Sequence, residues 1–286
     1  MNGKVIKKSA SFFNVICNNL NYICFSRKKV KNDASILVGD NVEFIKEDST
    51  YIIEKILPRK NKLIRPSVAN IDIIIIVISV VEPKLNTFQL NKYLAYYEYQ
   101  NIDNVIIYFS KMDLLKEKDE ILNKINEYKK DGYKCLFSDK TESIDTINTL
   151  FDKNNVICLA GESGVGKSTL INKLIPDSNI TTNIISKSLN RGKHTTTTSN
   201  LISYKNGFIV DTPGFGSIEL NIPNDEIAKS YNDFRSYGKY CKFRNCLHKN
   251  ENGCKVKEMV EKNKISKERY NDYLKIINSN KYKVKY

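Results

Sequence analysis

The chain has little of several residue types, and each shortage restricts what the protein can be. It has no tryptophan and only two histidines in 286 residues, so a histidine beside a motif is informative. No apolar run reaches membrane-spanning length, and the longest, residues 71–81, contains Asp72 and Ser79. That run is therefore expected to form a buried strand, and no contact with a membrane is predicted.

Export signals and a disulfide pattern are also missing. The N-terminus is basic but lacks the apolar region and small-residue cleavage site of a secretory signal peptide. The seven cysteines are an odd number and three of them cluster late in the chain, which argues against a disulfide framework. A cytoplasmic protein, most simply a monomer, is expected.

Acidic residues are in deficit, since 46 Lys and Arg face 32 Asp and Glu for a net charge of +14. The excess lies at the two ends: 13 basic against 6 acidic residues in 1–67, 17 against 18 in 68–224, and 16 against 8 in 225–286. Basic regions around a neutral middle favour a polyanionic partner such as nucleic acid. A source-wide lysine bias that aids solubility is the alternative, although it should have charged the middle as well.

Residues 1–67 show five short apolar segments separated by turn-forming sequences, including the basic stretch 26–33. This pattern predicts a small closed β-barrel of the oligonucleotide-binding (OB) kind, able to bind RNA. The basic turn would contact phosphates. Tyr22 and Phe25 are either stacking platforms for bases or core residues of the barrel.

Residues 57–70 contain Pro58 and Pro66 and are expected to form an irregular linker. In 68–224, apolar strand segments alternate with amphipathic stretches, which is typical of a parallel α/β sheet covered on both faces. Residues 225–286 form a third, separate region whose last part, from residue 266, is helical at first and then basic.

Residues 161–168, GESGVGKS, match the phosphate-loop pattern and lie between an apolar strand segment and a helical segment. The glycines let backbone N–H groups turn toward phosphate oxygens, and the helix N-terminus adds further donors. Lys167 would reach the β- and γ-phosphates and assist catalysis, and the Ser168 hydroxyl would ligate Mg²⁺. The predicted nucleotide contacts of this loop are Gly161, Glu162, Ser163, Gly164, Val165, Gly166, Lys167, Ser168 and Thr169.

A second phosphate-site signature, D-x-x-G, runs from Asp211 to Gly214 directly after an apolar strand segment. Asp211 is expected to hold Mg²⁺ through water, and the Gly214 N–H to sense the γ-phosphate.

A base-reading motif, SKMD at residues 110–113, ends another strand segment. Asp113 is placed to accept hydrogen bonds from the N1–H and 2-amino groups of guanine, a pair of donors that adenine lacks. Ser110 and Lys111 belong to the same motif. Ser138 ends the following strand, where guanine enzymes often add a backbone contact. GTP and GDP are therefore the predicted nucleotides.

The order of the motifs is unusual. The base-reading strand ends precede the phosphate loop and D-x-x-G in this chain, whereas ordinary GTPases run the other way round. A sheet can be assembled from strands in permuted order when the original termini lay close together. Residues 68–224 are therefore predicted to form a circularly permuted P-loop GTPase domain.

The polar segment 189–199, LNRGKHTTTTS, lies between the phosphate loop and D-x-x-G and is a candidate switch. Either Thr195 or Thr196 is expected to complete the Mg²⁺ shell, and spacing does not separate the two. Many GTPases follow D-x-x-G with a glutamine that orients the attacking water, but Phe215 occupies that place here. His194 is either its catalytic substitute or a surface histidine beside a basic loop.

The second histidine belongs to a cluster with the spacing C-x₄-C-x-H-x₅-C. Three thiolates and an imidazole in one short window are typical of a closed tetrahedral zinc site, which leaves no open position and is therefore structural. Free thiols clustered by chance are the alternative. The predicted ligands of one Zn²⁺ ion are Cys241, Cys246, His248 and Cys254.

Taken in order, these motifs resemble the family of circularly permuted, ribosome small subunit-dependent GTPases, over nearly the whole length. The resemblance implies an α/β fold: a circularly permuted P-loop GTPase domain (68–224) with an N-terminal OB-fold barrel (1–67) and a C-terminal helical zinc-binding domain (225–286). It also implies GTP hydrolysis stimulated by the small ribosomal subunit, contacts with its rRNA through both flanking domains, and a checkpoint or release role late in subunit maturation. Finally, it supports the nucleotide and zinc residues named above and a catalytic His194.

One position departs from the family pattern, because Ser110 stands where the family usually has asparagine. The shorter side chain cannot offer the same contact to guanine N7, so weaker guanine binding is expected, with selectivity kept by Asp113. Two other functions stay open from the residues alone. One is an ATP-dependent motor or small-molecule kinase, and the other is a passive RNA-binding factor with a vestigial nucleotide site.

Overall fold

The structure is a computed structural model, and it describes residues 1–27, 35–64, 66–102, 104–116, 119–175, 199–211, 218, 220–280 and 282. The chain divides into two compact units. One comprises Met1–Ile74, Glu142–Ala160 and Lys167–Phe215; the other comprises Ile75–Thr141, Gly161–Gly166 and Gly216–Tyr286.

The strands are β1 (Asn2–Lys8), β2 (Phe13–Cys17), β3 (Leu20–Ser26), β4 (Asn41–Glu47), β5 (Thr50–Ile56), β6 (Lys62–Leu63), β7 (Val68–Ala69), β8 (Ile73–Ser79), β9 (Asn104–Ser110), β10 (Lys134–Phe137), β11 (Val156–Ala160), β12 (Asn200–Tyr204) and β13 (Gly207–Asp211). The helices are α2 (Thr87–Tyr99), α3 (Asp119–Lys130), α4 (Thr141–Leu150), α5 (Lys167–Leu174), α7 (Asn224–Ile227), α8 (Asn232–Gly238), α9 (Lys255–Glu261) and α10 (Lys267–Ser279), with 3₁₀ turns η1 (Met112–Leu114) and η2 (Phe151–Lys153).

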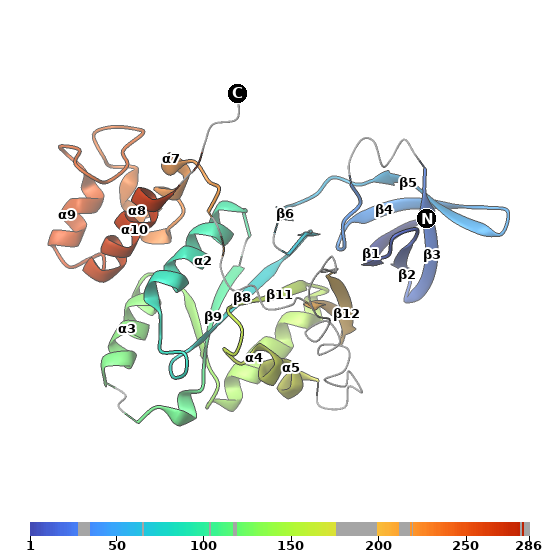
Figure 1. Cartoon of the computed structure of the whole chain (residues 1–286), viewed down its shortest axis with the longest axis horizontal. Coiled ribbons are helices and arrows are strands. Elements are labelled where there is room, and N and C mark those ends of the chain that lie inside the picture. Colours follow the sequence, from blue (N-terminus) through green and yellow to red (C-terminus); the bar gives the residue numbers. More distant parts are fainter. Residues whose placement is uncertain are drawn as a thin grey trace. The chain divides into compact units, whose positions relative to one another are not determined.

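The first five strands close into a barrel in the order β1-β2-β3-β5-β4 (Figure 1), which confirms the predicted barrel. Alternate residues point inward, as the strand period of two requires, and the core includes the fully buried Val15, Phe44 and Ile53. Tyr22 belongs to this core, because its ring centroid lies 5.3 Å from that of Phe44. Phe25 is 40% exposed. Of the two aromatic residues considered as stacking platforms, only Phe25 faces outward.

The segment expected to be an irregular linker contains the two-residue strands β6 and β7, paired antiparallel. The two prolines of this segment have no backbone N–H to donate, and side chains supply other hydrogen bonds that hold it. The Asn61 side chain accepts from Ile71 N at 2.9 Å and donates to Ile71 O at 2.7 Å. The buried Asp40 carboxylate accepts from Arg59 Nε at 2.7 Å. The segment is therefore tied to the end of the barrel.

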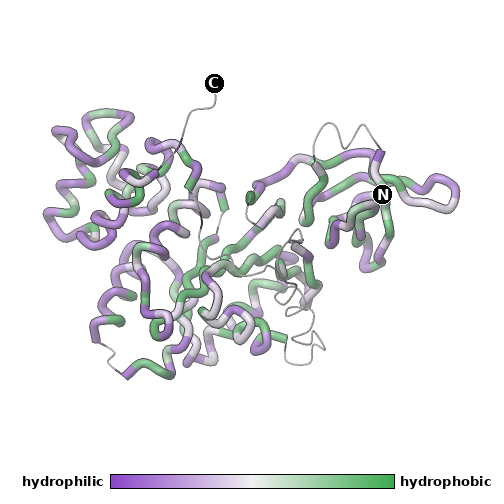
Figure 2. Tube along the Cα trace, in the orientation of Figure 1, coloured by the Kyte–Doolittle hydropathy of each residue, from purple (hydrophilic) through white to green (hydrophobic). Residues whose placement is uncertain are grey.

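Six strands form one sheet in the order β10-β9-β8-β11-β13-β12. All seven residues of β8 are buried, as expected for a central strand covered on both faces. Figure 2 shows β8 as a hydrophobic run, while α3 is largely hydrophilic. The β9–β10 and β11–β13 pairs are parallel, as predicted. The edge strand β12 is antiparallel to β13, a departure from the predicted parallel pattern that follows from the tight turn at residues 205–206 joining them.

The C-terminal helices α8, α9 and α10 enclose a small aromatic core. Tyr231, Phe234 and Tyr273 are each fully buried, and the Phe234 and Tyr273 ring centroids lie 4.9 Å apart. Helix α10 begins with Ser266 as its N-cap, whose side chain accepts from Arg269 N. Across the described ranges of the chain, no helix has the length and apolar character required to cross a bilayer.

Candidate nucleotide site and metal centre

The phosphate loop follows β11 and leads directly into α5. Gly161 has a φ of +142°, and a Cβ there would lie 2.3 Å from the Val77 carbonyl oxygen, so no side chain fits. Gly164, at the exposed crest, has a φ of +78° that L side chains rarely adopt. Between the two, Ser163 is exposed. The backbone thus makes a turn open to solvent in front of a helix N-terminus, the arrangement that binds phosphate oxygens.

The phosphate loop is tied to the base-reading motif. Ser110 is 4% exposed, and its hydroxyl donates to the carbonyl oxygens of Val165 in the loop and of Ile78, the latter at 3.2 Å. A Cβ on Gly166 would lie 3.5 Å from Ser110 Cβ, so the two segments are in van der Waals reach. Sequence reasoning placed both motifs at one site but missed this hydrogen bond, because no local pattern links residues 55 positions apart.

The rest of the base-reading motif forms a turn at the end of β9. Lys111 has a left-handed φ of 57°, and its ammonium group donates to the Glu82 carbonyl oxygen. Asp113 lies exposed in η1. The Ser138 hydroxyl accepts from Met112 N at 3.0 Å and so joins the ends of β9 and β10. The structure therefore brings Ser110, Lys111, Asp113 and Ser138 to one edge of the sheet.

Several predicted site residues fall outside the described part of the chain. These are His194, Thr195, Thr196 and Gly214, and the side chain of Asp211 joins them although its backbone ends β13. Ser168 and Thr169 are described, and both are exposed near the start of α5. Lys167 is the first residue of that helix and is partly exposed.

The four predicted zinc ligands converge, with one donor atom from each lying within 4.8 Å of the others. Cys241 Sγ is 3.7 Å and Cys254 Sγ 3.4 Å from His248 Nδ1, and the two sulfurs are 4.0 Å apart. Around a tetrahedral Zn²⁺ ion, bond lengths of about 2.3 Å to sulfur and about 2.0 Å to nitrogen place donors roughly 3.5–3.8 Å apart. The donor set and its spacing therefore fit a structural zinc ion.

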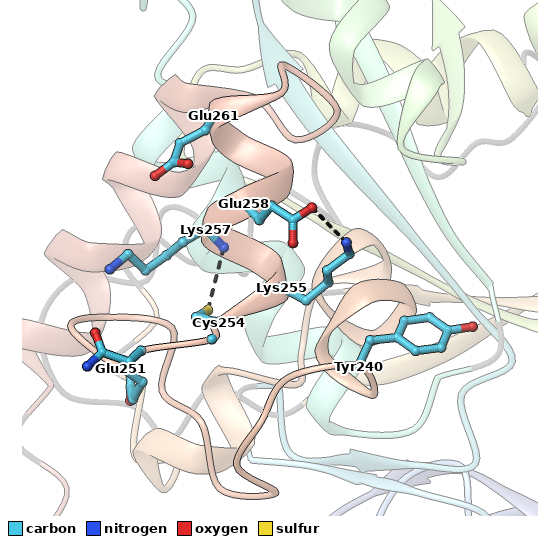
Figure 3. Close-up of a pocket in the computed structure, with 9 residues that line it drawn as sticks. Tyr240, Glu251, Cys254, Lys255, Lys257, Glu258 and Glu261 are labelled. Carbon is cyan, nitrogen blue, oxygen red and sulfur yellow. Dashed lines mark hydrogen bonds and ion pairs between the residues drawn. The ribbon is translucent and has the colours of Figure 1, made fainter.

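Backbone groups at the start of α9 support the sulfurs. Lys255 N donates to Cys241 Sγ at 3.3 Å and Lys257 N to Cys254 Sγ at 3.5 Å. Figure 3 shows the second of these bonds, beside the ion pair of Lys255 with Glu258. N–H groups aimed at sulfur favour the thiolate, and outer contacts of this kind hold metal ligands in place.

Protonation at the cluster depends on the metal. Burial raises the pKa of the Cys246 thiol to about 12 and lowers the pKa of His248. The lowered pKa keeps the imidazole neutral, as metal binding requires. The raised thiol pKa is overcome when a cation is bound, because a coordinated thiol is deprotonated.

A carboxylate shapes the loop between the ligands, and sequence reasoning missed it. Glu251 accepts from Leu247 N at 2.8 Å and from Lys249 N at 2.7 Å. Burial alone would raise its pKa, but these N–H donors outweigh burial and lower it. The Tyr270 hydroxyl donates to the His248 carbonyl at 2.6 Å. The metal loop, residues 241–254 with the four predicted ligands, is thus held in place by hydrogen bonds to Glu251 and from Tyr270.

The sequence resembles curated proteins over nearly its full length. A family model described as RsgA GTPase matches residues 56–221. The small ribosomal subunit biogenesis GTPase RsgA of Malacoplasma penetrans (strain HF-2) is 54% identical over 282 residues, covering 96% of this chain and 98% of that one. The protein of the same name from Clostridium botulinum (strain Eklund 17B / Type B) is 38% identical over 284 residues, covering 97% and 96%.

Solved structures resemble the whole chain as well. YloQ, described as a circularly permuted GTPase, superposes with a TM-score of 0.81 at 31% identity, covering 97% of this chain and 93% of that one. YjeQ from Thermotoga maritima gives a TM-score of 0.80 at 31% identity, covering 97% of each chain.

Proposed function

The chain belongs to the RsgA GTPase family and is a GTP hydrolase with a circularly permuted GTPase domain, and we propose that it acts on the small ribosomal subunit. This family membership confirms the predicted resemblance and fold class. In the proposed reaction the protein binds the subunit late in its maturation and hydrolyses GTP to GDP and phosphate when the subunit stimulates it. Hydrolysis then releases the protein, and the step serves as a checkpoint for assembly factors. The relatives' shared name, small ribosomal subunit biogenesis GTPase, supports the partner.

The observation that carries the nucleotide part of the proposal is the hydrogen bond from Ser110 to the Val165 carbonyl. It joins the base-reading motif to the phosphate loop, so one guanine nucleotide can contact both. Asp113 would accept from the N1–H and 2-amino groups of guanine, which excludes ATP. This geometry supports a GTPase over an ATP-dependent motor or kinase.

The nucleotide would lie along the loop with its phosphates against the backbone N–H groups of residues 161–169. Lys167 would contact the β- and γ-phosphates. The Ser168 hydroxyl, with Asp211 through water and Thr195 or Thr196, would hold Mg²⁺, which spreads the developing phosphate charge. Ser138 and Gly214 would add backbone contacts to base and γ-phosphate.

His194 is proposed to orient the attacking water. Support comes from the sequence: Phe215 stands where many GTPases have the glutamine that does this, and an apolar side chain cannot. We expect slow turnover in the free protein, because the usual glutamine is absent and the bound subunit must either order His194 or supply a catalytic group itself.

The two basic ends of the chain are proposed to hold ribosomal RNA, with the barrel within residues 1–67 and the zinc-binding region within 225–286, around a GTPase domain at 68–224. The surface beside the predicted zinc ligands supports this. Tyr240 and Phe243 are 66% and 45% exposed there, beside Lys239 and Lys242. Exposed aromatic rings among lysines suit the bases and phosphates of RNA. Action on the ribosome supports a cytoplasmic location, and we propose a monomer.

The proposal is tested by measuring GTP and ATP hydrolysis by the purified protein, with and without isolated small subunits. We expect slow GTP turnover that the subunits raise sharply, and no comparable ATP turnover. The His194→Ala variant should bind GTP like the parent and lose the stimulated turnover. No effect of the subunits would contradict the proposed partner, and full stimulated turnover by His194→Ala would contradict the catalytic assignment.

A further inference from the structure

A hollow of about 630 Å³ lies between the residues that lead into α2 and one face of α10. Its lining includes Lys84, Asn86 and Thr87 on one side and Lys267, Asn271 and Lys275 on the other. The three residues of α10 are spaced four apart, so they share one face of the helix. Both sides of the hollow belong to the same compact unit. We call it the α2–α10 groove.

The positive charges of the groove face solvent. Lys84, Lys267 and Lys275 are all exposed, the last with 66% of its side chain accessible. Within the described residues, neither Lys84 nor Lys267 has a carboxylate at ion-pair distance. These two ammonium groups are therefore available to an anion from outside.

Each of the two carboxylates of the groove already has hydrogen-bond and ion-pair partners within the protein. Glu268 accepts from the Thr87 hydroxyl at 3.1 Å and lies 3.8 Å from the ammonium group of Lys124. The side chain of Asp272 is 4% exposed; it accepts from Asn91 Nδ2 at 3.0 Å and pairs with Lys275 at 3.2 Å. Asp272 is therefore held inside the protein, whereas 45% of the Glu268 side chain is exposed and its carboxylate lies near Lys124. The three lysines of the lining still outnumber its two carboxylates, so the groove keeps a net positive charge.

We propose that the α2–α10 groove binds the phosphodiester backbone of RNA. The inference rests on the proposed function, since it assigns part of the RNA contact to a surface outside the barrel and the metal loop. Spaced ammonium groups with amide and hydroxyl donors between them match a run of phosphates, each a separate anion, better than one small anion. Lysine ammonium groups bind phosphates by charge, so we expect the contact to be independent of base sequence.

The groove adjoins the guanine motif along the chain. Lys84 follows Glu82 by two residues, and the Glu82 carbonyl accepts from the ammonium group of Lys111. The Ser79 hydroxyl anchors the same turn by donating to the Val81 carbonyl. RNA in the groove therefore contacts the segment that holds the base-reading lysine.

The test compares two double variants that each remove two positive charges. Lys84→Ala with Lys267→Ala alters the groove. Lys130→Ala with Lys153→Ala alters exposed lysines of the neutral middle region that do not line it. Affinities are measured over a series of KCl concentrations for purified small subunits and for a labelled single-stranded RNA. Thermal unfolding checks that all proteins are folded.

Removing one lysine that binds a phosphate reduces the magnitude of the slope of log affinity against log salt concentration by about 0.7 to 0.9. We expect the groove variant to lower it by about 1.4 to 1.8, and the control to leave it unchanged. Equal salt slopes for the two double variants would contradict the proposal that the α2–α10 groove binds RNA. A parent that fails to bind subunits, while free RNA still distinguishes the variants, would instead overturn the proposed function.

A crosslinking experiment identifies the occupant directly. With Asn271 replaced by p-benzoylphenylalanine, irradiation of the complex with small subunits should join the protein to rRNA. A crosslink to a ribosomal protein would mean that an acidic protein surface fills the groove, and competition by polyglutamate as strong as that by RNA would mean the same. Either result contradicts the proposal.

Discussion

At the scale of single residues, Ser110 shows how one substitution changes the role of a residue within a motif. The family's usual asparagine would face guanine N7, whereas the serine hydroxyl is buried and bonded to two backbone carbonyls. The side chain therefore holds the phosphate loop and has no donor left for the base. We therefore expect selectivity for guanine to depend on Asp113 alone and part of the affinity for guanine nucleotides to be lost.

We predict that Ser110→Asn binds GDP about fivefold more tightly than the parent, because one neutral hydrogen bond is worth about 1 kcal/mol. Ser110→Ala should bind GDP about tenfold less tightly, because the phosphate loop loses its hydrogen bond to residue 110 and the Val165 carbonyl is left without a donor. Fluorescent GDP titrations measure both, with ADP as the specificity control. An affinity of Ser110→Asn equal to that of the parent would contradict the assigned role.

At the scale of elements, the metal loop and α9 depend on one another. Cys254 is both a predicted ligand and the N-cap of α9, and the N–H groups of that helix point at two of the sulfurs. The loop between the ligands is polar, and the small aromatic core beneath it includes the ring of His248, 5.6 Å from that of Phe234. We therefore expect zinc binding and folding of this region to be coupled.

We predict one zinc ion per chain in the parent and close to none in Cys246→Ser, measured by atomic emission. In Cys246→Ser, near-ultraviolet circular dichroism should show that Tyr270 and Tyr273 are no longer packed. The chain has no tryptophan, so tryptophan bands do not overlap the tyrosine signal. Cys17→Ser, at a half-buried position in the barrel, is the matched control and should keep both properties. Unchanged zinc content in Cys246→Ser would mean that the ligand set is wrong.

A buried arginine holds α10 against neighbouring elements. The Arg269 side chain is 2% exposed, forms ion pairs with Asp131 and Asp233, and donates to the Tyr133 hydroxyl at 3.1 Å. The guanidinium also lies over the rings of three tyrosines, with centroid distances of 5.0 to 5.8 Å. Its charge is balanced only while both carboxylates are in place.

We predict that Arg269→Met destabilises the protein by about 3–5 kcal/mol, because it leaves buried carboxylates without a counter-charge. Urea unfolding measures this, and adding Asp131→Asn and Asp233→Asn should recover part of the loss. The control is Arg27→Ala, whose ion pairs with Glu47 and Glu54 are on the surface, with the Arg27 side chain 48% exposed and the two carboxylate side chains 44% and 42% exposed. That change should cost less than about 1 kcal/mol. Equal costs for the two arginines would rule out a special role for burial.

At the scale of the whole molecule, the charge distribution separates binding from chemistry. The middle of the chain, which carries the nucleotide motifs, is close to neutral, and the ends carry the positive excess. We therefore expect polyanion binding to be mostly electrostatic and sensitive to salt, and the bound nucleotide to control how well the flanking regions bind RNA.

We predict that the protein binds small subunits about tenfold more tightly with a non-hydrolysable GTP analogue than with GDP, within the usual range of coupling energies. By reciprocity the subunit should tighten binding of the analogue by the same factor, which a second titration checks. Sedimentation with subunits at fixed salt measures the first quantity. Equal affinity in the two nucleotide states would contradict the proposed switch.

The sequence by itself determined the features that depend on neighbouring residues. The phosphate loop, the base-reading tetrapeptide and the zinc ligands each occupy a short window in which residue type and spacing encode the geometry. The barrel and most sheet strands were predictable for the same reason, because strand periodicity and turn residues are local. The switch residues are predicted on these grounds alone.

Tertiary structure decided what connects distant residues. Only folding brings Ser110 to Val165, Arg269 to Asp131, or Lys84 to the face of α10, because side chains meet across elements through packing that no local period records. The same holds for Tyr22 and Phe25, which look alike in sequence and face opposite sides of one barrel strand. Local chemistry thus specified the sites, and long-range packing specified how they are supported and coupled.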